Sequence, residues 1–100
     1  VGGVKKEYIS KVALCTGSGG ELIHRAALLG ADAFITGDIK YHDAQFAKEL
    51  NILVVDAGHF ATEIIIMEEL KKYLNKEITI LNKDIKIITS KTNKDFIEWN

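Results

Sequence analysis

Residues 52–58 read Ile-Leu-Val-Val-Asp-Ala-Gly, and they are the most informative part of the sequence about the fold. Four apolar residues in a row are too few for a buried helix, and three of them are β-branched, which favours a strand. A strand without polar alternation is typical of the centre of a parallel sheet that is covered on both faces. Asp56-Ala57-Gly58 ends the run, so the sequence predicts a central parallel strand at residues 52–55.

The segments before this strand alternate between two patterns. Short apolar runs predict strands at residues 11–15 and 33–36, and a glycine-containing turn follows each of them. Apolar side chains at helical spacing predict helices at residues 21–29 and 41–50. Gly30 follows the first helix directly and is predicted to end it as a C-cap.

A longer helical pattern follows at residues 59–74, with apolar side chains at spacings of three and four residues. Beyond it, residues 78–81 and 85–89 predict two more strands, joined by the turn-forming residues 82–84. The alternation of strands and helices predicts an α/β fold, a three-layer-like domain with a mainly parallel sheet flanked by helices. We expect one such domain over residues 1–100.

Size and charge exclude several classes of protein. The chain has 100 residues, of which 47% are hydrophobic and 27% charged, with a mean hydropathy of +0.04. These values are typical of one globular domain and exclude a disordered chain. Thirteen Lys and Arg against fourteen Asp and Glu give a net charge of −1 without a basic run, so no nucleic-acid partner is expected. The longest apolar run, residues 64–67, is far shorter than the roughly 20 residues of a membrane span, so no membrane association is expected.

Cysteine usage bounds the cellular compartment. Cys15 is the only cysteine, so neither an internal disulfide nor a thiolate zinc framework can form, and we interpret it as a small buried hydrophobe. No signal segment is recognisable at the start, and together these features favour a cytoplasmic location. Because the first residue is Val1 and not methionine, we expect a fragment of a longer chain.

Polar side chains gather in three segments that follow the predicted strands, at residues 16–20, 37–42 and 56–59. The polar residues of these segments and of the helix starts are Ser18, Asp38, Lys40, His42, Asp43, Asp56 and His59. Because the carboxyl ends of parallel strands share one edge of a sheet, these side chains should lie near one another. The sequence therefore predicts a functional site at this edge.

The segment Thr-Gly-Ser-Gly-Gly at residues 16–20 has three interpretations. Its glycines are typical of an anion-binding nest at a helix start, but Leu22 occupies the position where a dinucleotide-binding motif has glycine. A nucleophile elbow centred on Ser18, with Asp56 and His59 as partners, is disfavoured because hydrolases built on that motif are far longer. The favoured interpretation is a tight strand-to-helix turn in which Ser18 caps the helix.

His59 and Glu63 form the candidate pair with the most weight, four residues apart at the start of a predicted helix. This spacing puts both side chains on one helix face, where an imidazole nitrogen and a carboxylate oxygen can reach the same ion. Such pairs are also common on solvated helix faces. The position of the pair, directly after a strand end, favours metal binding. His24, in contrast, is expected to be an exposed helix residue without a ligand role.

Two motifs resemble a known family. Gly-Asp-Ile-Lys-Tyr-His at residues 37–42 and Asp-Ala-Gly-His-Phe-Ala-Thr-Glu at residues 56–63 strongly resemble the C-terminal part of the Nif-three-like proteins, also called GTP cyclohydrolase I type 2 homologues. The resemblance covers about residues 11–65, and residues 96–99 are similar to the family's C-terminal end. It implies that this chain is the C-terminal portion of a Nif-three-like fold.

The resemblance implies a dinuclear metal centre in a toroidal homohexamer, with His59 and Glu63 as ligands and Glu63 bridging both ions. Two divalent ions are expected per complete site, and one histidine with one glutamate suits zinc, manganese, iron or nickel (Zn, Mn, Fe or Ni) alike. The family's other ligands, adjacent histidines and an aspartate, come from an N-terminal half that has no counterpart in these 100 residues. We therefore expect this chain alone to hold metal weakly.

Asp38, Lys40 and His42 are implied to lie beside the metal centre as catalytic or substrate-facing groups. A histidine can orient a ligand carboxylate or shuttle a proton, and a lysine can neutralise a phosphate, which suits a metal-dependent hydrolase. The expected substrate is a phosphate- or nucleotide-containing small molecule. Two alternatives stay open: Asp38 caps the second helix while Lys40 is solvated, or the complete protein is a non-catalytic metal-binding scaffold or regulatory protein-interaction module.

Overall fold

The computed structural model describes residues 1–99. Contacts within the chain group into two compact units, Val1–Thr62 and a second unit that begins at Glu63. The prediction of one α/β domain over residues 1–100 stays a prediction. Every helix within residues 1–99 is too short or too polar to cross a membrane.

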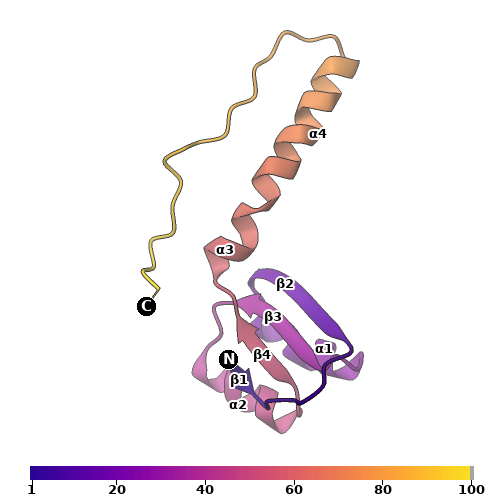
Figure 1. The fold of residues 1–100 in the computed structure, drawn as a ribbon, viewed down its shortest axis with the longest axis vertical. Coiled ribbons are helices and arrows are strands. Elements are labelled where there is room, and N and C mark those ends of the chain that lie inside the picture. Colours follow the sequence, from indigo (N-terminus) through magenta and orange to yellow (C-terminus); the bar gives the residue numbers. More distant parts are fainter. Residues whose placement is uncertain (100) are drawn as a thin grey trace. The chain divides into compact units, whose positions relative to one another are not determined.

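The first unit is built on a four-stranded sheet whose strands alternate with helices along the chain (Figure 1). In chain order the elements are β1 (Gly2–Gly3), β2 (Val12–Ser18), η1 (Gly20–Leu22), α1 (Ile23–Leu28), β3 (Ala33–Gly37), α2 (Tyr41–Glu49) and β4 (Leu53–Asp56). The strands lie in the order β1-β4-β3-β2, in which β2, β3 and β4 are parallel and β1 is antiparallel to β4. The predicted α/β fold with a mainly parallel sheet flanked by helices is therefore confirmed.

The core of the first unit lies between the sheet and the helices α1 and α2. The strand register sets Phe34 of β3 beside Ala13 of β2 and Val54 of β4. Ile23 of α1 and Ala47 of α2 are fully buried in the same apolar cluster as Phe34 and Val54. Both helices therefore cover the same face of the sheet, as right-handed crossovers between successive neighbouring strands require. The prediction that the strand at residues 52–55 is covered on both faces is wrong within this unit, since Leu53 and Val55, on the other face from Val54, are only partly buried.

The end of β2 differs from the prediction. The strand continues three residues beyond the predicted end at residue 15, and its pairing with β3 is irregular between Leu14 and Ser18. Gly17 makes this possible, because its φ of +66° is a backbone conformation that glycine adopts without strain. The residue that precedes η1 is Gly19, which has no side chain to cap it. The prediction that Ser18 caps the first helix is wrong, because Ser18 belongs to the strand.

A long helical segment follows β4, as predicted, but it is interrupted near its start and extends further. α3 spans His59–Ile64 and α4 spans Ile66–Ile80. The helix extends beyond residue 74 because Ile78 continues the three- and four-residue spacing of the apolar side chains.

The two strands predicted near the C-terminus are wrong. Residues 78–80 belong to α4, where the hydroxyl of Thr79 donates to the carbonyl oxygen of Asn75, one helical turn earlier, at 2.9 Å. Residues 85–89 have no ladder partner in the part of the chain that the structure describes. A short strand without a neighbour leaves its backbone groups to water and gains no sheet packing, so it does not form.

Asp32 ties the segment before β2 to the start of β3. Its Oδ2 accepts hydrogen bonds from the backbone N–H and the hydroxyl of Ser10 and from the backbone N–H of Lys11, each at 3.0 Å. The ammonium of Lys6 lies 3.4 Å from Oδ1. The backbone donors of Ser10 and Lys11 hold the pKa of Asp32 well below its usual range, because they stabilise the ionised form.

We expect Asp32→Asn to melt at a lower temperature than the wild type at neutral pH, because the amide keeps one acceptor oxygen and loses the charge. A carboxylate with a depressed folded pKa stabilises the fold above its unfolded pKa of about 3.9 and loses that contribution as the pH falls further. The gap in melting temperature should therefore narrow from about pH 5 to about pH 2, followed by circular dichroism. Glu7→Gln, an exposed carboxylate in the same segment, is the control and should show no gap. A gap that does not change with pH would contradict this account.

Candidate functional site

The carboxyl ends of the parallel strands lie at one edge of the sheet, and two buried threonines join them. Thr36 of β3 is fully buried and donates its hydroxyl to the carbonyl oxygen of Gly17 at 3.0 Å. Thr62 of α3 accepts the N–H of Gly17 at 2.9 Å and donates to the carbonyl oxygen of Gly58 at 2.9 Å. These bonds satisfy both backbone groups of Gly17 and hold the end of β2 and the segment after β4 to the end of β3.

The start of α3 approaches the end of β3 so closely that only glycine fits at position 37. A Cβ atom at Gly37 would lie 2.6 Å from the backbone nitrogen of His59 and 2.8 Å from the carbonyl carbon of Gly58. Both distances are well inside van der Waals contact. The absence of a side chain at Gly37 is therefore what lets His59 lie against the end of β3.

Asp38 and His59 pair across the two segments that follow β3 and β4. Oδ2 of Asp38 lies 2.5 Å from Nδ1 of His59, and the side chains of His59 and Asp38 are 43% and 44% exposed. Because an ionised carboxylate only accepts hydrogen bonds, Nδ1 carries the proton in this contact. Asp38 adopts a left-handed backbone conformation with φ of +54°, which is uncommon outside glycine but tolerated by aspartate.

Asp56 ends β4 and joins the same two segments through its carboxylate. Its Oδ2 accepts the backbone N–H of Ile39 at 3.0 Å, and its Oδ1 accepts the backbone N–H of Gly58 at 2.9 Å. Ile39 follows Asp38 and Gly58 precedes His59 in the sequence. Each carboxylate oxygen of Asp56 therefore accepts a hydrogen bond from a residue that is adjacent in sequence to Asp38 or to His59.

Asp38 does not cap α2. The helix begins after Lys40, whose N–H donates to Oδ2 of Asp43 at 2.9 Å. Asp43, in the first turn of α2, thus provides the capping carboxylate, a position where the helix dipole favours negative charge. The alternative in which Asp38 caps this helix is wrong, because the Asp38 carboxylate contacts His59 instead.

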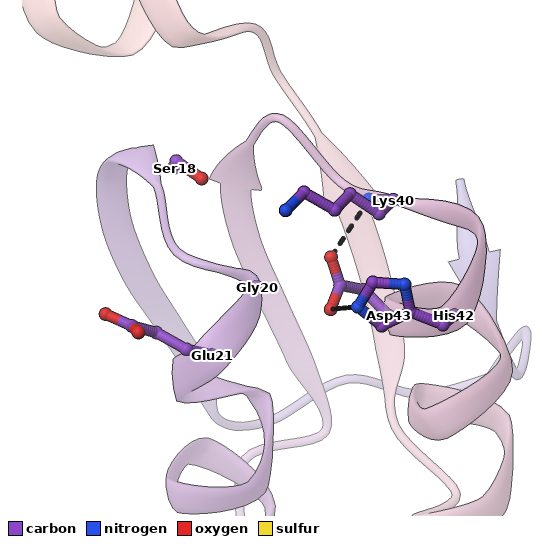
Figure 2. Close-up of a pocket in the computed structure, with 6 residues that line it drawn as sticks. All are labelled: Ser18, Gly20, Glu21, Lys40, His42 and Asp43. Atoms are coloured by element: carbon purple, nitrogen blue, oxygen red, sulfur yellow. Dashed lines mark hydrogen bonds and ion pairs between the residues drawn. The ribbon is translucent and has the colours of Figure 1, made fainter.

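Lys40, His42 and Asp43 line a cavity of about 350 Å³ at the N-terminal end of α2 (Figure 2). The other residues that line it are Ser18, Gly20 and Glu21. Nε2 of His42 lies 3.5 Å from Oδ1 of Asp43, and the His42 side chain is 74% exposed. In Figure 2 the Lys40 side chain extends from the start of α2 toward the strand that carries Ser18. The structure thus brings Lys40 and His42, both predicted to face a substrate, to one cavity.

The glycine segment after β2 contacts a carboxylate of the chain itself. A Cβ atom at Gly20 would lie 2.5 Å from Oδ2 of Asp43, so this oxygen lies against the backbone of Gly20. A carboxylate here occupies the region where a phosphate would approach an anion-binding nest. This contact disfavours the phosphate-binding interpretation of residues 16–20 and favours a structural turn.

His59 and Glu63 both lie in α3, four residues apart. Within residues 1–99, no three side chains of the types His, Cys, Asp and Glu lie close enough together to hold a metal ion. The assignment of His59 and Glu63 as metal ligands stays a prediction.

Known proteins match this chain in sequence and in structure. The profile of the family described as Duf34/NIF3 (NGG1p interacting factor 3) matches residues 1–95. A Listeria innocua protein named GTP cyclohydrolase 1 type 2 homolog is 38% identical over 90 residues, which cover 90% of this chain and 24% of the relative.

Two crystal structures share the fold. One is of a Staphylococcus aureus protein, 33% identical with a TM-score of 0.86, for which the match covers 99% of this chain and 32% of the other. The second is of a Bacillus cereus protein related to NIF3, 29% identical with a TM-score of 0.83, for which the match covers 89% of this chain and 24% of the other. The chain thus spans between about a quarter and a third of the length of the proteins it matches.

Proposed function

Because this chain belongs to the Duf34/NIF3 family, we propose that it supplies His59 and Glu63 as ligands to a divalent-metal-binding protein. The contact between Asp38 and His59 is the observation that carries the proposal. A histidine that ligates a metal commonly donates its other ring N–H to a carboxylate, which fixes the ring orientation and the tautomer. With Nδ1 donating to Asp38, the proposal assigns ligation to Nε2.

The donor chemistry of α3 suits a divalent transition metal. An imidazole nitrogen and a carboxylate oxygen are ligands for zinc, manganese, iron and nickel, and a spacing of four residues puts them on one helix face. Two protein donors are fewer than the three that catalytic sites commonly have, so further donors would come from the rest of the complete protein. In this proposal the complete site would hold two ions, and Glu63 would be among the residues that hold them.

For the complete protein, we propose hydrolysis of a phosphate- or nucleotide-containing small molecule. Bound divalent ions would supply Lewis-acid chemistry at the site. The ammonium of Lys40, which lines the cavity beside α2, would neutralise a phosphate of the substrate. His42 would accept or donate a proton there, with Asp43 orienting its imidazole ring.

The competing function is a non-catalytic metal-binding scaffold, and turnover separates the two. A complete family protein that carries these residues, loaded with zinc, manganese or iron, should release product from a phosphoester or nucleotide above background. Metal binding without turnover would favour the scaffold. The proposal further takes the complete protein to be a cytoplasmic homohexamer.

Metal binding by the present chain tests the ligand assignment. We expect His59→Ala, Glu63→Gln and Asp38→Asn each to weaken zinc and manganese binding by about tenfold or more in isothermal titration calorimetry. His24→Ala removes a histidine that stacks on Phe46, with ring centroids 6.2 Å apart, and should leave the affinity unchanged. Wild-type affinity in His59→Ala, or an equal loss in His24→Ala, would show that the ligands lie elsewhere.

A further inference from the structure

We infer that Asp56 is a positioning residue for His59: its carboxylate clamps the two segments that carry the Asp38–His59 pair and thereby fixes the tautomer of the His59 imidazole. The consequence for metal affinity rests on the proposed ligand role of His59. The clamp itself is tested on the metal-free chain. In this proposal Asp56 acts on His59 through the backbone N–H groups of Ile39 and Gly58.

The clamp consists of two hydrogen bonds that start from one carboxylate. Oδ2 holds the N–H of Ile39 and Oδ1 holds the N–H of Gly58, at 3.0 and 2.9 Å. Hydrogen bonds to an ionised acceptor are roughly twice as strong as bonds between neutral groups. Ile39 follows Asp38 and Gly58 precedes His59 in the sequence, so these two hydrogen bonds fix the backbone from which each side chain of the Asp38–His59 pair starts.

Backbone strain at Asp38 favours a change of conformation in the segment after β3. Asp38 has φ of +54°, in the left-handed region, whereas Gly58, with φ of +86°, adopts such a conformation without strain. A residue with a side chain is unfavourable in that region, so Asp38 tends to return to an ordinary conformation when nothing holds it. The bond from Ile39 to Asp56 holds the peptide unit that follows Asp38. Without it, the Asp38 carboxylate would leave Nδ1 of His59.

Asp32 provides a matched comparison within the same unit. Its carboxylate also accepts two backbone N–H groups, those of Ser10 and Lys11, and it also ties a segment to a strand. Neither donor is next to a member of the Asp38–His59 pair. A general loss of stability would follow from removing either carboxylate, whereas a change at the imidazole of His59 should follow from removing Asp56 alone.

The test is nitrogen-15 NMR of the histidine side chains in the metal-free chain, recorded near pH 9, well above the usual histidine pKa of about 6.5. In the wild type we expect His59 mainly as the tautomer with the proton on Nδ1. In Asp56→Asn, the His59 imidazole should shift toward the tautomer with the proton on Nε2, which imidazole favours in water, and zinc affinity should fall about tenfold.

Asp32→Asn is the control: it should melt at a lower temperature than the wild type and leave the His59 signals and the zinc affinity unchanged. If Asp56→Asn does not fold, Asp56→Glu takes its place. This variant keeps the charge but displaces the carboxylate by one methylene, and it should shift the tautomer of His59 in the same direction.

Two results would overturn the inference: wild-type His59 signals in the folded Asp56 variants, or the same change in Asp32→Asn. The inference and the proposed ligand role can fail separately. If the tautomer of His59 shifts in Asp56→Asn but His59→Ala binds zinc like the wild type, the positioning role of Asp56 is supported and only the ligand role of His59 is wrong.

Discussion

Replacing Gly37 by alanine is expected to lower the free energy of unfolding by about 3 kcal/mol, which corresponds to a fall in melting temperature of more than about 10 °C for a unit of this size. A Cβ atom there would lie 2.6 Å from the backbone nitrogen of His59. Backbone cannot rotate away as a flexible side chain would, so the start of α3 must shift as a whole. The shift should also separate His59 from Asp38 and lower the metal affinity. Urea unfolding followed by circular dichroism measures the first effect.

Gly30→Ala is the control for Gly37→Ala. Gly30 has φ of +77°, but the nearest atom to a Cβ atom there is Nζ of Lys11 at 3.9 Å. Its cost should therefore be the backbone term alone, about 1 kcal/mol. If Gly37→Ala lowers the free energy of unfolding no more than Gly30→Ala does, α3 does not pack closely against the end of β3.

Thr62→Val is expected to lower the free energy of unfolding by about 2 kcal/mol. Valine has nearly the shape of threonine, so packing is kept while the hydroxyl is lost. The buried N–H of Gly17, which donates to the Thr62 hydroxyl at 2.9 Å in the wild type, then loses its acceptor. Leaving a buried donor without a partner costs more than the bond itself contributes, because the desolvation of the N–H is no longer compensated.

The matched control for Thr62→Val is Thr79→Val, at an exposed position where the hydroxyl bonds only to its own helix. It should change stability by less than about 0.5 kcal/mol. A double-mutant cycle with Thr36→Val should show coupling, since Thr62 accepts the N–H of Gly17 and Thr36 donates to the carbonyl oxygen of the same residue. Equal, small effects of Thr62→Val and Thr79→Val would mean that the Gly17 N–H is satisfied without Thr62.

β2, β3, β4, α1 and α2 are predictable from the sequence because short apolar runs and helical spacing are local patterns. Residues 33–36 lie within β3, and residues 53–55 of the predicted strand 52–55 lie within β4, whereas Ile52 precedes it. The two-glycine strand β1 carries no such pattern and is not predicted. Residues 78–81 are not predictable in this way, because Ile-Thr-Ile alternates like a strand and also continues the helical spacing of α4. A strand wins only where a neighbouring strand is present to pair with it, which local sequence does not report.

The edge of the sheet that carries the candidate site is predictable, since it follows from strand direction alone. The contacts that shape it are not. Gly17 and Thr62 meet although they are 45 positions apart, and no spacing rule connects them. Asp43 did carry a signal, because acidic residues are favoured in the first turn of a helix, although Lys40 is not one of the usual capping residues. Ser18 is the opposite case: serine is a favoured capping residue, but Ser18 is the last residue of β2 and caps no helix.

In the proposed site, α3 presents His59 to a divalent ion through Nε2 while Asp38 holds the proton on Nδ1. The decisive experiment is a zinc titration of the nitrogen-15 labelled chain, with the histidine side chains observed by NMR. We expect the Nε2 signal of His59 to move as zinc is added, Nδ1 to keep its proton, and His24 not to respond. Zinc-induced changes confined to His24 and His42, or coordination of His59 through Nδ1, would contradict it.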